Sequence, residues 1–93
     1  MKVTMTVAIT KPGLYVGSVR KEVDLPFAPN IGMKICCAAW KSERKVENVT
    51  LSFDPDYKVE SLCLGMGTIE TKNEEELSSL INTYKAHGWT FSE

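Results

Sequence analysis

The sequence predicts an α+β fold, in which an antiparallel sheet of four to five strands is followed by one C-terminal α-helix packed on one face. Two observations predict this class. The first two thirds of the chain alternate apolar and polar residues between turn signals, and residues 71–91 repeat apolar residues at helical spacing. The 93 residues fit one domain, 1–93. We expect a meander-like sheet, with strong curling towards a barrel as the main variant.

The start of the helix is indicated by capping signals. Thr71 and Glu74 match a capping box, while Asn73 with Glu76 makes a rival start two residues later. Three glutamates follow in the first turn, where the helix dipole favours negative charge. The apolar stripe that should face the sheet consists of Leu77, Leu80, Ile81 and Tyr84.

The end of the helix is also marked. Lys85 and His87 supply positive charge in the last turn, and Gly88 tolerates the positive φ that commonly ends a helix. A Schellman ending at Gly88 would place Trp89 against Tyr84.

Residues 3–25 predict a β-hairpin. Residues 3–9 alternate apolar and polar side chains, and Lys11-Pro12-Gly13 is typical of a type II turn. The second strand runs from Leu14 to Leu25, and Gly17 interrupts its inward row, as a β-bulge does. That inward row is Tyr15, Val19, Val23 and Leu25.

Three further strands are expected before the helix. The third runs from Met33 to Trp40, where a helix is the alternative because Met, Lys and Ala favour helices. The fourth runs from Val46 to Phe53 and the fifth from Tyr57 to Leu64, separated by a turn at Asp54-Pro55-Asp56. Gly65-Met66-Gly67 is expected to bend the chain into the helix. The inward residues are Met33, Ile35, Cys37 and Ala39 on the third strand and Val49, Leu51 and Phe53 on the fourth.

Composition excludes several classes of function. A formal charge of −1 gives no general attraction to nucleic acid or to anionic membranes. No apolar run approaches the ~18–20 residues of a membrane-spanning helix. The three cysteines cannot all pair within one chain, and none belongs to a C-x-x-C motif. We therefore expect reduced thiols and a cytoplasmic protein.

The residues that carry chemistry form no convincing site. Cys36, Cys37, Cys63 and His87 satisfy a zinc formula on paper, but adjacent residues of a strand point to opposite faces. Neither Cys37 nor Cys63 lies among basic residues that would favour a thiolate. We expect no catalytic residues, no metal and no cofactor.

A second apolar set lies on the opposite parity from the expected core. It consists of Val16, Cys36, Ala38, Trp40, Leu62 and Leu64. Either a partner covers this set or a curled sheet buries it. Our hypothesis is an interface formed by Trp40, Ala38, Cys36, Leu62 and Leu64. The predicted function is a small binding or interaction module that self-associates as a homodimer or binds another protein.

The alternative prediction is a small-ligand binder or a thiol-dependent enzyme with its site between sheet and helix. Such a site would use Tyr57, Tyr84, Trp89 or Cys36. The two predictions differ in shape. An enclosed pocket with convergent polar groups favours the ligand site, and a flat apolar face favours the interface.

Overall fold

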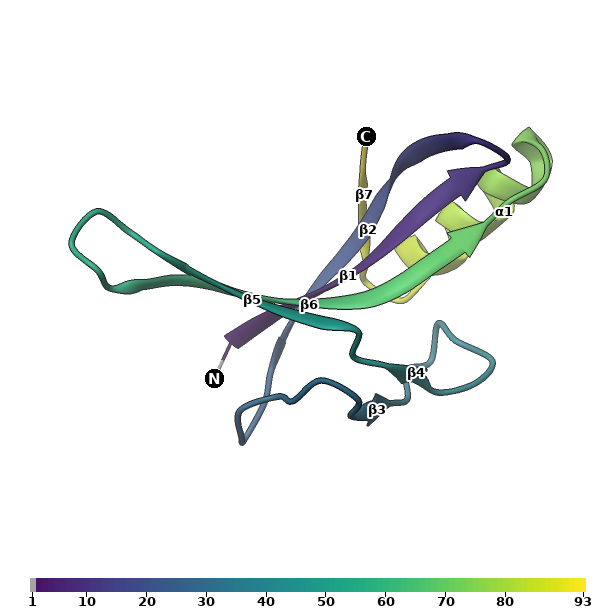
Figure 1. Cartoon of the computed structure of the whole chain (residues 1–93). Coiled ribbons are helices and arrows are strands. Elements are labelled where there is room, and N and C mark those ends of the chain that lie inside the picture. The colour runs from purple at the N-terminus through teal and green to yellow at the C-terminus, as the bar shows by residue number, and fades with distance from the viewer. Residues whose placement is uncertain (1) are drawn as a thin grey trace.

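The fold is built on a five-stranded sheet, and a computed structural model describes residues 2–93 of the chain (Figure 1). The elements in chain order are β1 (Lys2–Lys11), β2 (Leu14–Asp24), β3 (Lys34–Ile35), β4 (Arg44–Lys45), β5 (Asn48–Phe53), β6 (Val59–Glu70), α1 (Glu74–Ala86) and β7 (Thr90–Ser92). The large sheet has the order β5-β6-β1-β2-β7, and β3 pairs with β4 in a separate two-stranded ladder. The predicted α+β class with a C-terminal helix is confirmed, and the sheet does not close into a barrel.

The predicted β1–β2 hairpin is confirmed. The strands pair in an antiparallel register from Lys2–Asp24 to Lys11–Leu14, and Gly13 at the turn has a φ of +72°. Ile9 faces Gly17 and Thr10 faces Tyr15, so β2 contains one extra residue at this point. The bulge therefore lies beside Gly17, as the interrupted inward row predicts.

The pairing of β6 differs from a meander. β6 runs parallel to β1, with Met5 facing Leu64 and Thr10 facing Glu70, and antiparallel to β5. The predicted bend at residues 65–67 is wrong. Gly67 has a φ of +95°, and the register with β1 shifts between Thr6 and Ala8, so a bulge accommodates the glycines and the strand continues.

The helix begins at the second of the two predicted capping sites. Asn73 is the N-cap, and its Oδ1 accepts a hydrogen bond from the Glu76 backbone N–H at 2.8 Å. Thr71 does not cap the helix, because its hydroxyl and its N–H both donate to the Thr10 carbonyl. Within residues 2–93, no helix combines the length and the apolar character needed to cross a membrane.

The helix ends as the sequence predicts. Gly88 has a φ of +85° and donates to the Lys85 carbonyl, while the Trp89 N–H donates to the Tyr84 carbonyl. These two bonds define a Schellman motif. The chain then turns into β7, an unpredicted strand in which Phe91 faces Val19 of β2.

The predicted third strand, Met33 to Trp40, is wrong beyond its first residues. Only Lys34 and Ile35 pair, and they pair with β4 instead of the large sheet. The alternation itself holds, because Met33, Ile35, Cys37 and Ala39 pack against the core. A turn in which the Trp40 N–H donates to the Cys37 carbonyl then redirects the chain, so Trp40 also reaches the core.

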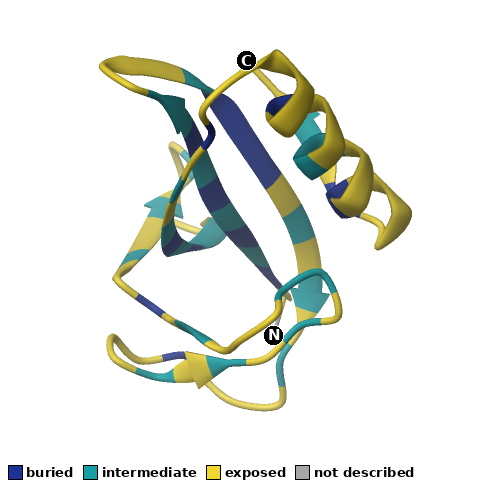
Figure 2. Cartoon of the chain, turned by 90° about the vertical axis from the view of Figure 1, so that its right-hand side faces the viewer, coloured by how far each residue is buried: buried dark blue, intermediate teal, exposed yellow. Residues whose placement is uncertain are grey.

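The core lies on one face of the large sheet. Figure 2 shows buried residues gathered on the central strands and on the helix. Alternate residues of β1 are buried, and they meet Leu77 and Tyr84 of the helix and Val46 before β5. The buried β1 residues are Val3, Met5, Val7 and Ile9. The helix and the segment of residues 33–46 therefore cover the same core.

Candidate functional site

The β5–β6 hairpin projects beyond the rest of the molecule (Figure 1). Twelve residues of β6 rise through roughly 40 Å at about 3.3 Å each, whereas the 13 residues of α1 rise through only about 20 Å. The longest dimension of the molecule, 43 Å, is similar to the length of that strand. One helix can therefore cover only about half of β6. The end of the β5–β6 hairpin that lies beyond the helix, residues 51–62, is called the arm below.

Large apolar side chains of the arm are exposed to solvent. The exposed fractions are 49% for Leu51, 51% for Phe53, 85% for Tyr57 and 63% for Val59. Cross-strand partners share a face, and Val49 faces Leu64, which is fully buried. Alternation then places Leu51 and Phe53 on the core side of the sheet. The prediction correctly places these two residues on the core side of the sheet. It is wrong about their burial, because the core does not extend this far.

The tip of the arm is a tight, ordered turn. The Asp54 side chain accepts hydrogen bonds from the N–H groups of Asp56 and Lys58, both at 2.9 Å. This is the side-chain bonding that the Asp-Pro-Asp sequence predicts. Tyr57 has a φ of +60°, and it is the only non-glycine residue with a positive φ within residues 2–93. A left-handed conformation costs a residue with a Cβ roughly 1–2 kcal/mol, whereas glycine adopts it without this cost. The turn therefore has a tyrosine at a position where glycine would be less strained.

The outer edge of β5 is open. In the described part of the chain, β6 is the only strand that pairs with β5. The strand reads Asn-Val-Thr-Leu-Ser-Phe, without a charge, a proline or a glycine. Proteins usually protect edge strands with such residues, because unpaired N–H and C=O groups attract other strands. β5 therefore presents both apolar side chains and a free backbone edge.

The residues predicted to form an interface are not gathered on one open face. Leu64 is fully buried in the core, and Leu62 and Trp40 pack partly against it. Cys36 and Ala38 are exposed in the turn after β3, away from the large sheet. Leu62 alone belongs to the arm, where it faces Leu51.

The interface hypothesis grouped residues wrongly because it compared odd and even residue numbers between different strands. Even-numbered Leu64 faces odd-numbered Val49 on one side and odd-numbered Met5 on the other. Facing residues share a side of the sheet, so at residues 63–65 the even positions of β6 lie with odd positions of β5 and β1, and the register shifts further along the strand reverse this relation. Parity identifies a face within one strand but not between strands of unknown register.

An aromatic cluster joins the helix to the segment that precedes β4. The Trp40 indole N–H donates to the Tyr84 hydroxyl at 2.8 Å. Trp89 lies 5.0 Å from Tyr84 and 5.7 Å from Trp40 between ring centres. Burial raises the pKa of Tyr84 above its usual value near 10, although the bond from Trp40 and the charge of Arg44 act in the opposite direction.

This pKa shift predicts a loss of stability at alkaline pH. The folded state holds the Tyr84 proton more tightly than the unfolded state, so this contribution is complete below about pH 10 and is lost as the pH rises through the folded pKa. Urea unfolding from about pH 8 to about pH 11 should show a steeper alkaline decline for wild type than for Tyr84→Phe. Parallel curves for the two proteins would contradict the assignment.

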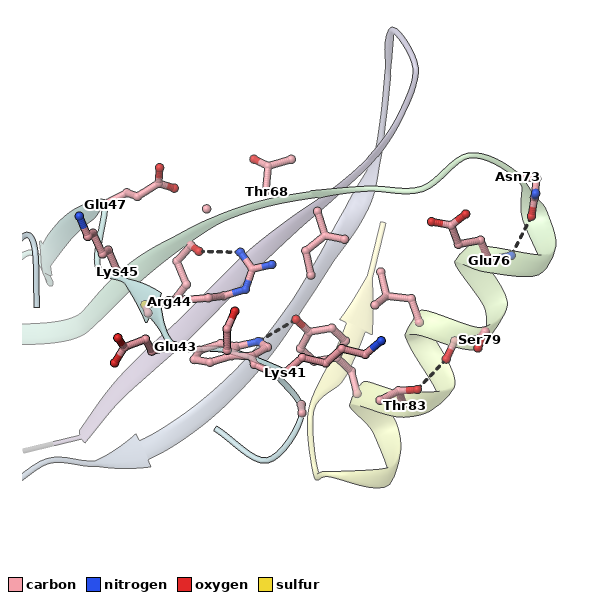
Figure 3. A pocket seen from close by; sticks show the side chains of 18 of the residues that line it. Lys41, Glu43, Arg44, Lys45, Glu47, Thr68, Asn73, Glu76, Ser79 and Thr83 are labelled. Carbon is pink, nitrogen blue, oxygen red and sulfur yellow. Dashed lines mark hydrogen bonds between the residues drawn. The ribbon is translucent and has the colours of Figure 1, made fainter. Parts of the chain in front are cut away.

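An open groove lies between the helix and the β3–β4 region (Figure 3). Its volume is about 1150 Å³. Arg44 forms part of one wall, donates to the Met66 carbonyl at 3.3 Å and lies 5.8 Å from the centre of the Trp40 ring. Lys41 and Lys45 lie on the same side, while Glu75 and Glu76 line the helix side. The groove therefore combines opposite charges with an open shape.

The groove contains little of the predicted ligand site. Tyr84 lines it, but Tyr57 lies at the tip of the arm, and Trp89 is buried and does not line the groove. Cys36 is absent from the lining, as is every other cysteine among the described residues. The geometry therefore supplies no thiol for chemistry in this groove.

The cysteines and His87 do not assemble as a zinc site. All three cysteines are free thiols, with Cys36 exposed and Cys37 and Cys63 partly buried. His87 caps the C-terminus of the helix, and its carbonyl accepts a hydrogen bond from the Lys21 ammonium. Across residues 2–93, no three potential metal-ligating side chains of His, Cys, Asp or Glu converge.

The arm is the surface that sequence reasoning missed. One signal was present, because the turn at residues 54–56 places Phe53 and Tyr57 at the far end of a hairpin. The length of that hairpin was not predicted, since the fifth strand was expected to end at Leu64 and β6 continues to Glu70.

Comparisons do not assign the chain to a class of proteins. It matches no protein-family model, and neither curated proteins nor solved structures match it.

Proposed function

We propose that this protein is a protein-interaction module whose binding surface is the arm. The observation that carries the proposal is the exposed continuation of the core face along Leu51, Phe53 and Val59. These side chains lie on the apolar side of the sheet, yet their exposed fractions are 49%, 51% and 63%. Exposed apolar surface of this kind is typical of interaction sites.

The tip of the arm supports the same proposal. Tyr57 is 85% exposed and holds a left-handed conformation that glycine adopts without strain. Backbone strain of this kind is often found at functional sites, and tyrosine is enriched among interface hot spots. A role in partner contact explains why a tyrosine occupies this position.

Site-specific photocrosslinking tests the proposal. A benzoylphenylalanine at position 57 should form covalent adducts with protein in native cell extract, whereas the same group at Tyr15 should not. Tyr15 is a matched control, because it is an exposed tyrosine, 58%, at the turn of the other hairpin. Excess unlabelled wild type should compete for adduct formation, and Phe53→Glu should compete much less.

Two results would contradict this proposal. Equal adducts at positions 57 and 15 would indicate non-specific contact, and competition by Phe53→Glu as strong as by wild type would remove the apolar face from binding. Phe53 is half exposed, so its replacement should leave the fold intact. Circular dichroism of the variant checks this.

Binding of a small molecule in the groove is the second candidate. The specific observation in its favour is the volume of about 1150 Å³ beside Trp40 and Arg44. The groove is open and lined by opposite charges, whereas ligand sites are usually concave and mainly apolar. The arm therefore has the stronger physical argument.

A further inference from the structure

The pattern of side chains on β5 is self-complementary. We propose that the partner of the arm is a second copy of this chain, joined β5 to β5 in an antiparallel pair around a two-fold axis at Leu51. This inference rests on the proposed interaction function and names its partner. The two five-stranded sheets would then form one continuous sheet, with the apolar residues of both arms on the same face.

The free edge of β5 can accept a further strand. Antiparallel addition of a strand satisfies the outward N–H and C=O groups that β5 leaves unpaired within residues 2–93. The opposite edge of the sheet, β7, has only three residues, whereas β5 has six. Because β5 carries no charge or proline, a second copy meets no repulsion or missing donor along it.

The symmetry restricts the register. A two-fold axis perpendicular to the sheet keeps each side chain on its own face. The axis must therefore pass midway between the two copies of one residue, and it pairs only residues of equal parity. An axis at Leu51 pairs apolar with apolar on one face and hydroxyl with hydroxyl on the other. The resulting pairs are Leu51 with Leu51, Val49 with Phe53, and Thr50 with Ser52.

The neighbouring registers are less favourable. An axis at Thr50 places Glu47 opposite Phe53, which sets a charge against an apolar ring. An axis at Ser52 pairs Val49 with Pro55, which cannot donate to the ladder. Aromatic with β-branched pairs and paired hydroxyls stabilise neighbouring strands, and the Leu51 axis supplies both.

Exposed aromatic side chains of the arm supply part of the area that a standard interface buries. Phe53 and Tyr57 are 51% and 85% exposed, and aromatic side chains of their kind bury about 150–250 Å² each. Together they offer roughly 200–350 Å², about a third of the ~800 Å² per partner in a standard interface. Leu51, Val59 and the paired backbone add to this area.

Sedimentation velocity of the purified chain tests self-association. Wild type should be a dimer, and Leu51→Lys should be a folded monomer, because two ammonium groups would face each other across the axis. We expect the dimer dissociation constant to rise roughly tenfold or more. The matched control is Leu14→Lys, since Leu14 is 61% exposed at the β1–β2 turn, and this variant should remain a dimer.

Cysteine crosslinking tests the register. In a background with Cys36→Ser, Cys37→Ser and Cys63→Ser, Leu51→Cys should form a disulfide-linked dimer on oxidation. Directly opposite residues have Cα atoms about 4.5–5.5 Å apart, within the range of disulfides. Thr50→Cys should not crosslink, because the two copies of position 50 would lie more than about 7 Å apart.

The outcomes separate this inference from the proposed function. A monomeric wild type would overturn self-pairing, while a photocrosslink from position 57 to a different protein would still support the arm as an interaction surface. A dimer that Leu51→Lys leaves intact, or one that crosslinks through neither cysteine, would overturn pairing through β5. Crosslinking through Thr50→Cys alone would overturn the register.

Discussion

Trp89→Ala is expected to lower the free energy of unfolding by about 3–5 kcal/mol, the usual cost of removing a buried tryptophan. Trp89 is 2% exposed and packs against both Tyr84 and Trp40. It also follows Gly88, so its ring holds the end of the helix against the core. Urea unfolding measured by circular dichroism gives the change directly.

Trp89→Phe is the control for this experiment. The indole N–H of Trp89 is buried and has no hydrogen-bond partner among the described residues. Phenylalanine keeps much of the ring while removing that donor, so its cost should be well below that of alanine. If both variants lost the same free energy of unfolding, the packing of the Trp89 ring would not be the source of its contribution to stability.

Leu64→Ala should cost about 2–5 kcal/mol, the second largest expected effect. Leu64 is fully buried at the centre of the sheet, between Val49 of β5 and Met5 of β1. Truncation leaves a cavity that three paired strands cannot easily close. Leu14→Ala, at a position 61% exposed, should change stability by only about 0.5 kcal/mol. Similar losses at both positions would contradict the burial of Leu64.

Features determined by neighbouring residues were predictable. The Schellman ending at Gly88, the turn at Gly13 and the side-chain bonds of Asp54 each depend on residues within a few positions. The choice between Thr71 and Asn73 as N-cap depends on a contact that is distant in the sequence, so the residues around the helix start did not determine it. Thr71 bonds to Thr10, which lies on a strand at the other end of the chain, and this contact leaves Asn73 to cap the helix.

Features determined by strand pairing were less predictable. Alternation correctly placed Met33, Ile35, Cys37 and Ala39 on one side, but an extended segment that packs on a core alternates as a strand does. The interface hypothesis depended on a register that links Leu64 to Met5 and Val49, which no local pattern specifies. The position of the arm required knowing how far the helix reaches.

The parallel pairing of β1 with β6 has a consequence for how the chain folds. Met5 and Leu64 are neighbours in the sheet although about 60 residues separate them in sequence. During synthesis the β1–β2 hairpin emerges before β6 and the helix, so its apolar row has neither of them to pack against until they have been made. Closing so long a loop costs entropy before the contact stabilises the fold, so folding should be slow for a chain of this size. During that interval the hairpin is the segment most vulnerable to association with other nascent chains.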